Sequence, residues 1–144
     1  MNLKFRLEHD SFGDLLVPFD ALYGAQTQRA IENFRISGLP MPAEFIQAMA
    51  MIKAAASEAN GVLGHMPKAK ARAISKAANA VASGGLADQF PVDVFQTGSG
   101  TSTNMNLNEV IAGLVRRQSK LSVHPNNEVN LGQSSNDVVP SSSL

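Results

Sequence analysis

Residues 96–109 have the sequence QTGSGTSTNMNLNE, in which two glycines flank Ser99 and further small polar side chains follow. Beyond Met105 the apolar residues recur with a helical period, so this polar turn is predicted to lie at a helix N-terminus. The first N–H groups of a helix have no partner within it, and the helix dipole is positive at that end. Such an end suits an anion, and Ser or Thr hydroxyls can add hydrogen bonds to a carboxylate without adding charge. A small anionic ligand is therefore the first hypothesis for the turn.

The same turn also fits an ordinary helix start, because Ser and Thr are common N-caps and glycines are common turn residues. The residues alone leave both interpretations open. A nucleotide-binding loop is excluded, since the chain contains no Gly-x-x-x-x-Gly-Lys-Ser/Thr sequence and residues 98–100 lack the third glycine of a dinucleotide fingerprint.

With 144 residues, 44% of them hydrophobic, the chain has the size and composition of one globular domain. Its 12 basic and 12 acidic residues balance, so bulk charge attracts neither nucleic acid nor a membrane surface. The chain has no cysteine and only scattered histidines, so we expect no disulfide and no metal site. It also contains no apolar run near the roughly 20 residues of a membrane span and no signal or transit segment, so the cytoplasm is the expected location.

The start of the chain is predicted to be extended and the next segment helical. Apolar and polar residues alternate over residues 3–17 around a turn at residues 10–13, which indicates a small hairpin or arm. Residues 20–34 are predicted to form a short helix with Asp20 as its N-cap.

Three longer helices are predicted from apolar residues at three- and four-residue steps, over residues 42 to 61 or 64, residues 67–83, and residues 103 to about 118. Their buried stripes are expected to be Phe45, Ile46, Met49, Ile52 and Ala56; Ala71, Ile74, Ala78, Val81 and Ala82; and Leu107, Ile111, Leu114 and Val115. Asn104 and Asn108 share another face of the last helix. An irregular connector spans residues 88–96, and the fold is predicted to be mainly α with a small β element at its start.

Residues 123–130 and 133–137 are rich in polar side chains and contain little apolar material. Solvated loops have this composition, but so do functional loops on rigid scaffolds. Both interpretations stay open from the residues alone.

Taken together, the segments resemble the class II fumarases, the metal-independent branch of the fumarase/aspartase superfamily. The matching stretches occur in the family's order from about residue 10 to the C-terminus. They are GAQTQRA at 24–30, DQFPVDVFQTGSGT at 88–101, NMN at 104–106, NEVIA at 108–112, HPN at 124–126 and QSSND at 133–137.

Three details favour a fumarase over an aspartase. Aspartases typically differ from this sequence at the TGSG turn of residues 97–100. They usually have Asn in place of His124, and Ser-Thr-Asn-Asp in place of residues 134–137. An aspartase-like ammonia lyase remains the alternative enzyme class.

The resemblance implies a lyase of the tricarboxylic acid cycle that adds water reversibly to fumarate, giving (S)-malate, with no metal or redox cofactor. One carboxylate of the substrate is assigned to residues of two loops, namely Ser99, Gly100 and Thr101 with Ser134, Ser135 and Asn136. A second, peripheral dicarboxylate site is matched by His124, Pro125, Asn126 and Asn127. Most relatives have Asp in place of Asn127, although an amide can still donate a hydrogen bond to an anion.

Members of this family are considerably longer, and we therefore expect residues 1–144 to form a single N-terminal domain without the central helical bundle and the C-terminal domain. The catalytic loop and the activating histidine have no counterpart here, so no catalytic residue is assigned. The family assembles as homotetramers whose active sites draw on three subunits, whereas this chain alone is expected to be an inactive monomer or loose dimer. A stand-alone dicarboxylate- or partner-binding module without catalysis is the other alternative.

Overall fold

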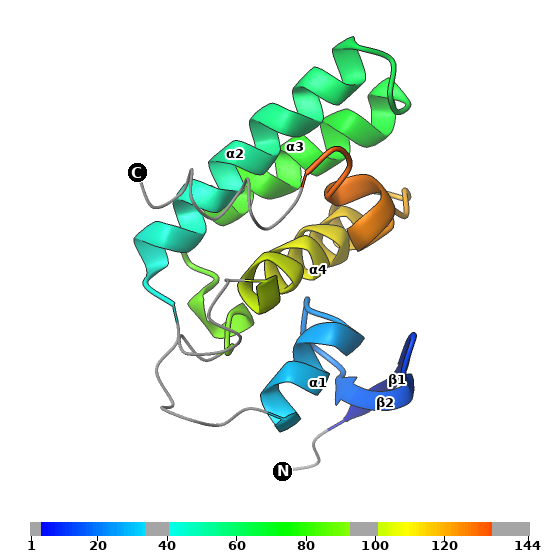
Figure 1. Ribbon diagram of the computed structural model, residues 1–144, viewed down its shortest axis with the longest axis vertical. Helices are drawn as coiled ribbons and strands as arrows, with labels where there is room; N and C mark the ends of the chain where they lie inside the picture. The colour runs from blue at the N-terminus through cyan, green and yellow to red at the C-terminus, as the bar shows by residue number, and fades with distance from the viewer. Residues whose placement is uncertain (1–3, 34–40, 93–100, 134–144) are drawn as a thin grey trace.

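The computed structural model describes residues 4–33, 41–92 and 101–133 of the chain (Figure 1). The elements in chain order are the strands β1 (Phe5–Asp10) and β2 (Gly13–Pro18), the helices α1 (Ala25–Asn33), α2 (Ala43–Val62) and α3 (Lys68–Ala82), the 3-10 turn η1 (Ala87–Gln89), helix α4 (Thr101–Gln118) and the π-helical turn η2 (Pro125–Val129). The predicted mainly α fold with a small β element at its start is confirmed. None of the described helices is both long and apolar enough to cross a membrane.

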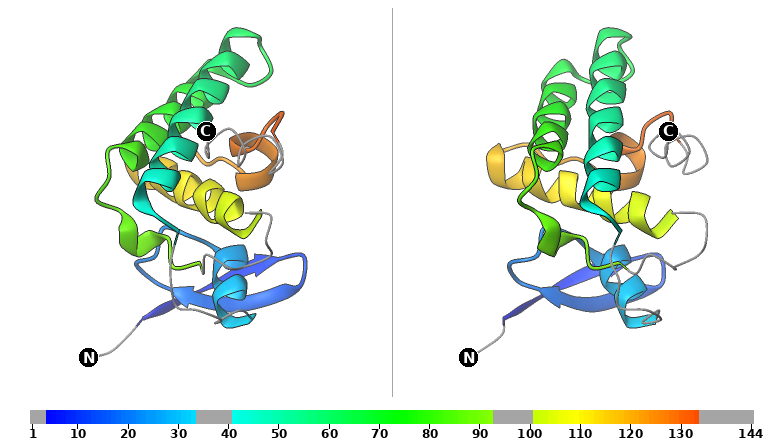
Figure 2. Two further views of the ribbon diagram at one scale, coloured as in Figure 1. Left: turned by 60° about the vertical axis from the view of Figure 1, so that its left-hand side comes forward. Right: turned by 90° about the vertical axis from the view of Figure 1, so that its left-hand side faces the viewer.

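Helix α4 occupies the middle of the molecule. The α2–α3 pair lies on one side of it, and α1 with the hairpin lies on the other, in all three views (Figures 1 and 2). Of the predicted core residues, Leu107, Ile111 and Val115 are fully or almost fully buried. The helix begins at Thr101, two residues before the predicted start.

The predicted hairpin is confirmed, with β1 and β2 paired antiparallel from Phe5 opposite Pro18 to Asp10 opposite Gly13. Its tip is fastened to α1 by Arg29, whose Nε and Nη2 each donate to the Asp10 carboxylate over 2.8 Å. The guanidinium holds the pKa of the Asp10 carboxyl below its usual value. This ion pair therefore fixes how the hairpin lies against the helix.

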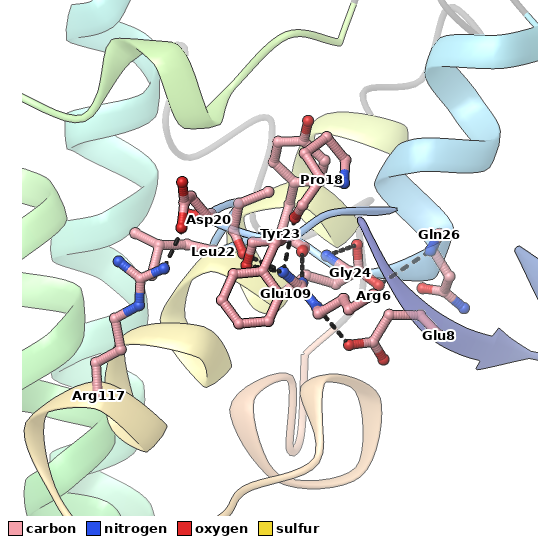
Figure 3. A network of polar contacts seen from close by, with 12 residues as sticks. Arg6, Glu8, Pro18, Asp20, Leu22, Tyr23, Gly24, Gln26, Glu109 and Arg117 are labelled. Atoms are coloured by element: carbon pink, nitrogen blue, oxygen red, sulfur yellow. Dashed lines mark hydrogen bonds and ion pairs between the residues drawn. The ribbon is translucent and has the colours of Figure 1, made fainter. Parts of the chain in front are cut away.

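The predicted helix over residues 20–34 is wrong at its start, because α1 begins at Ala25 and Asp20 is not its N-cap. The guanidinium of Arg6 binds carbonyl groups of this segment, and those of Ala21 and Tyr23 are ones that a helix from residue 20 would need for its own bonds (Figure 3). Arg6 donates to the carbonyl oxygens of Pro18, Phe19, Ala21 and Tyr23 over 2.6–3.1 Å. Residue 34 lies outside the described residues.

The N-terminal N–H groups of α1 are satisfied by a distant side chain instead of a local cap. The carboxylate of Glu109, on α4, accepts from the backbone N–H groups of Gly24 (3.0 Å), Gln26 (3.0 Å) and Thr27 (2.9 Å). Such charge-assisted bonds are stronger than neutral ones, and a negative charge is favoured at a helix N-terminus. Glu109 therefore joins α1 to the central helix (Figure 3).

Helices α2 and α3 confirm the predicted pair and pack closely against each other. A Cβ added to Gly61 would lie 2.7 Å from the Ala71 Cβ, so small residues set this close approach. The stripe predicted for α3 is buried except for the half-buried Ala82, but that of α2 is rotated. Ile52 and Ala56 are half-buried, while Lys53 and Ser57 lie in the core instead.

The predicted connector after α3 contains the short turn η1 (Ala87–Gln89), followed by Phe90 and Val92. Both of these apolar side chains are buried and anchor the segment to the core, as predicted for them. Residues 93–96 lie outside the described residues.

Gly113 lets α4 approach the segment before α1, because a Cβ at this position would overlap the carbonyl oxygen of Leu22. We expect Gly113→Ala to destabilise the chain by about 1–3 kcal/mol through overpacking. Helix propensity alone predicts the opposite sign, a gain of about 1 kcal/mol for Ala over Gly. The free energy of unfolding from urea titration checks this, and a more stable variant would contradict the close approach.

Glu109→Gln places an amide N–H₂ where a carboxylate oxygen now accepts a backbone N–H. We expect the variant to lose about 1.5–3 kcal/mol of unfolding free energy, since a hydrogen bond to a charged group is lost and a donor is left unpaired. The exposed Glu32→Gln on α1 serves as the matched control and should be nearly neutral. An equal loss of unfolding free energy in the two variants would show that the Glu109 carboxylate does not stabilise the start of α1.

Candidate functional site

The predicted anion-binding turn precedes α4. The first residue of that helix is Thr101, so the sequence 98–101 meets the helix at its N-terminus, as expected. Ser99 and Gly100 lie outside the described residues, as do Ser134, Ser135 and Asn136 of the second predicted loop. The part of the site that the structure describes is therefore the scaffold on which these two segments begin.

The first two turns of α4 carry buried amide side chains on more than one face. Asn104, Asn106 and Asn108 are at most 3% exposed, so the predicted polar face of Asn104 and Asn108 is not turned to solvent. The Asn106 amide donates to the carbonyl oxygen of Gln89 over 2.9 Å. The side-chain oxygens of all three residues have no hydrogen-bond partner among the described residues. Buried polar atoms are nearly always satisfied, so these oxygens indicate donors that come from elsewhere.

A buried lysine that was not predicted as functional lies beside this region. Lys53 of α2 is completely buried, and its Nζ donates to Asn130 Oδ1 (3.2 Å) and Gln133 Oε1 (3.0 Å). The Asn130 Oδ1 atom also accepts from Asn104 Nδ2 (3.3 Å). The helical spacing contained a signal for this position, because Lys53 follows Met49 by four residues and so lies on the same face.

Burial lowers the pKa of Lys53 from 10.5 to about 7, because the charged form loses its hydration. Among the described residues no carboxylate forms an ion pair with it. The two amide oxygens of Asn130 and Gln133 are thus its described acceptors, and both belong to the segment that leads into residue 134.

The predicted second site, residues 124–127, forms the start of the turn η2 rather than an open loop. The His124 Nδ1 atom accepts from the N–H groups of Asn126 (3.1 Å) and Asn127 (3.0 Å), so the imidazole caps the turn. An acceptor at Nδ1 requires the ring proton on Nε2 in the neutral form. His124 N in turn donates to Glu128 Oε1 over 2.9 Å, which completes a reciprocal cap.

Glu128 is fastened on its other side by Lys70 of α3, with 2.7 Å between Nζ and Oε2. Burial raises the pKa of the Glu128 carboxyl, but the bonds from Lys70 and from the His124 N–H outweigh it and lower the pKa. The turn is therefore held at both ends, which explains why this polar sequence is ordered.

A cavity of about 420 Å³ adjoins this turn and the cap of α1. It is lined by the hairpin tip, the start of α1, one face of α4, and His124, Pro125 and Asn126. Asn127 is not among the lining residues. Arg116 of α4 lines it and has no ion pair with a described carboxylate, but Glu8, Asp10 and Glu109 line the same cavity. These three carboxylates are bonded to Arg6, to Arg29 and to the N–H groups before and at the start of α1.

Lys53 makes the stability of the folded chain depend on pH. Between about pH 7 and pH 10.5 the unfolded state binds more protons at this residue, so stability rises with pH in this window. The difference in unfolding free energy between the wild type and Lys53→Met should therefore rise toward high pH, with a slope approaching about 1.4 kcal/mol per pH unit. Urea titrations at several pH values measure it, and a flat difference would contradict a buried titrating amine.

Comparison with known proteins extends over most of the chain. A family model described as lyase (Lyase_1) matches residues 13–143. The fumarate hydratase class II of Xylella fastidiosa strain Temecula1 is 63% identical over 137 residues, which are 95% of this chain and 29% of that protein. That of Halobacterium salinarum is 54% identical over 145 residues, covering 97% of this chain and 31% of the relative.

Solved structures give the same result. The class II fumarase from Schistosoma mansoni superposes with a TM-score of 0.92 at 41% identity, covering 96% of this chain and 31% of the other. A fumarate lyase:delta crystallin from Brucella melitensis superposes with a TM-score of 0.90 at 43% identity. The match covers 96% of this chain and 34% of the other.

The chain thus spans about a third of the length of the proteins it matches. Its match to the family model covers residues 13–143, a range that includes the residues directly before α4. The chain belongs to this lyase family within the fumarase/aspartase superfamily, and it corresponds to the N-terminal region of the class II fumarate hydratases.

Proposed function

We propose that this chain is the N-terminal domain of a fumarate hydratase and supplies hydrogen-bond donors to one carboxylate of fumarate or malate. The observation that carries the proposal is the start of α4 at Thr101, directly after the sequence Gly98-Ser99-Gly100. Unpaired N–H groups and the helix dipole favour an anion at this end of an 18-residue helix. The similarity to fumarate hydratases supports the choice of ligand.

In this proposal the substrate carboxylate is bound by two segments, with Ser99, Gly100 and Thr101 from the first and Ser134, Ser135 and Asn136 from the second. Removal of a proton from C3 of malate places a second negative charge on the adjacent carboxylate. Donors that are already oriented toward that carboxylate stabilise the charge without reorganisation. The base and the remaining groups belong to the parts of the family that this chain does not match, and no metal or redox cofactor is invoked.

A peripheral dicarboxylate site at His124, Pro125, Asn126 and Asn127 is part of the same proposal. The cavity beside η2 supports it, because three of these residues line it together with Arg116. The carboxylates of Glu8, Asp10 and Glu109 in the same lining are already bonded to other groups of the chain. Asn127 lies outside the lining, so its change from the usual Asp affects this cavity less than the sequence alone suggested.

We also propose that the chain needs further domains for assembly and catalysis. Large apolar side chains on the hairpin and just beyond it are about half exposed or more, namely Phe5, Leu7, Phe12, Leu16 and Phe19. Exposed apolar surface of this kind favours weak association. Alone, the chain is expected to be a monomer or loose dimer, with the homotetramer and the cytoplasmic location remaining predictions.

A chimera tests the proposal directly. The matching N-terminal region of the Xylella fastidiosa fumarate hydratase is replaced by this chain, and formation of fumarate from malate is followed by absorbance. We expect activity in the chimera and none in the isolated 144-residue chain, which lacks a positioned base. A folded, tetrameric but inactive chimera would contradict the proposal, and activity of the isolated chain would contradict its dependence on further domains.

Thr101→Val in the active chimera tests the turn itself. Loss of one hydrogen bond to a charged group costs about 1.5–3 kcal/mol, so kcat/KM should fall roughly 10- to 100-fold with little change in Tm. If Thr101 only caps the helix, Val instead costs about 1 kcal/mol of stability and leaves the kinetics unchanged. Measuring Tm and kcat/KM on the same variant separates the two roles.

A further inference from the structure

Lys53 is a buried cation whose described partners all belong to one short segment. Its side chain is completely buried, and Nζ donates to Asn130 Oδ1 over 3.2 Å and to Gln133 Oε1 over 3.0 Å. No described carboxylate neutralises it. Desolvation of an ammonium group without an ion-pair partner is costly, so this residue does not serve the core as an apolar side chain would.

The bonds of Lys53 hold residues 130–133 in a defined conformation. The Asn130 amide, oriented by Lys53, donates through Nδ2 to the carbonyl oxygen of Gln133 over 3.0 Å. The Gln133 amide, oriented in the same way, donates through Nε2 to the Val129 carbonyl oxygen over 3.3 Å. Each amide thus offers its oxygen to the ammonium and its nitrogen to the backbone of the segment.

The hydrogen bonds around Lys53 also reach the first turns of α4. Asn130 Oδ1 accepts from both Lys53 Nζ (3.2 Å) and Asn104 Nδ2 (3.3 Å). Asn104 lies three residues after Thr101 on α4, and η2 packs beside that helix (Figures 1 and 2). One buried ammonium therefore connects α2 with the helix that follows the first predicted carboxylate-binding segment and with the residues that precede the second.

We propose that Lys53 is a positioning residue for the carboxylate site: through Asn130 and Gln133 it fixes residues 130–133, which lead directly into Ser134, against α4. This inference rests on the proposed function. Because Lys53 is completely buried, it acts through these two amides and not by contact with the substrate. Burial lowers the pKa of Lys53 to about 7, so the amine is partly uncharged near neutral pH, and both its charged and its neutral form have N–H groups to donate to these two oxygens.

Hydrogen exchange on the 144-residue chain tests the anchoring without any substrate. The backbone N–H groups of Asn130, Leu131 and Gln133 donate to the carbonyl oxygens of Pro125, Glu128 and Asn130. In Lys53→Met we expect exchange at these three positions to accelerate about ten-fold or more, because the hydrogen bonds from Lys53 that orient the side chains of Asn130 and Gln133 are lost. Lys70→Met is the matched control, because Lys70 bonds Glu128 of the neighbouring turn from a partly exposed position. It should leave exchange at Gln133 unchanged, because that N–H group bonds to Asn130 and not to the turn that Lys70 fastens.

Kinetics of the chimera described above test the positioning. Lys53→Met should raise KM for malate about ten-fold and also lower kcat, because the same donors bind the substrate carboxylate and stabilise the charge that it gains in the transition state. Lys70→Met should change neither. Gln133→Met removes one acceptor from the segment side and keeps the buried lysine, so it should shift exchange and KM in the same direction even if Lys53→Met folds poorly.

The outcomes separate this inference from the proposed function. Unchanged exchange at residues 130–133 in both Lys53→Met and Gln133→Met would overturn the anchoring, whatever the catalytic result. Faster exchange at residues 130–133 with an unchanged KM for malate would show that Lys53 only stabilises the fold, and it would overturn the positioning role. An inactive parent chimera would contradict the proposed function and with it the positioning of a substrate site, while the exchange result would still decide the anchoring.

Discussion

The carboxylate of Glu109 accepts three backbone N–H groups, from Gly24, Gln26 and Thr27, and the arrangement of the N-terminal third of the molecule depends on it. It satisfies the start of α1 from the middle of α4, so the helix and the hairpin bound to it are oriented by the central helix. Gly113 lies one turn further along α4 and leaves room for the carbonyl group of Leu22. The carboxylate of Glu109 and the space left by Gly113 thus both position the segment from Leu22 to Thr27 against α4.

Other positions of α4 serve a different purpose. Asn104, Asn106 and Asn108 place buried amides in its first two turns, where an ordinary core helix would have apolar side chains. Their oxygens lack partners among the described residues. Such an arrangement costs stability unless donors arrive from elsewhere, which is the energetic pattern of a functional site and not of a purely structural helix.

Two different sets of hydrogen bonds stabilise the polar segment after α4. At η2, His124 and Glu128 cap each other locally, and Lys70 fastens the turn at the protein surface. Residues 130–133 are instead held by hydrogen bonds from the buried side chain of Lys53. The first is a short-range motif that polar loops often contain, whereas the second requires a helix that lies about 80 residues earlier in the chain.

Local signals in the sequence determined the hairpin, the limits of α2 and α3, and the helix that follows the glycine turn, because each rests on turn residues and apolar spacing within a few residues. Family motifs determined the class of protein. Only the tertiary structure decided where α1 begins, since Arg6 and Glu109 reach the segment before it from other elements. It also decided how a buried Lys53 is satisfied: the spacing places Lys53 on the face of Met49, but its acceptors come from a distant turn.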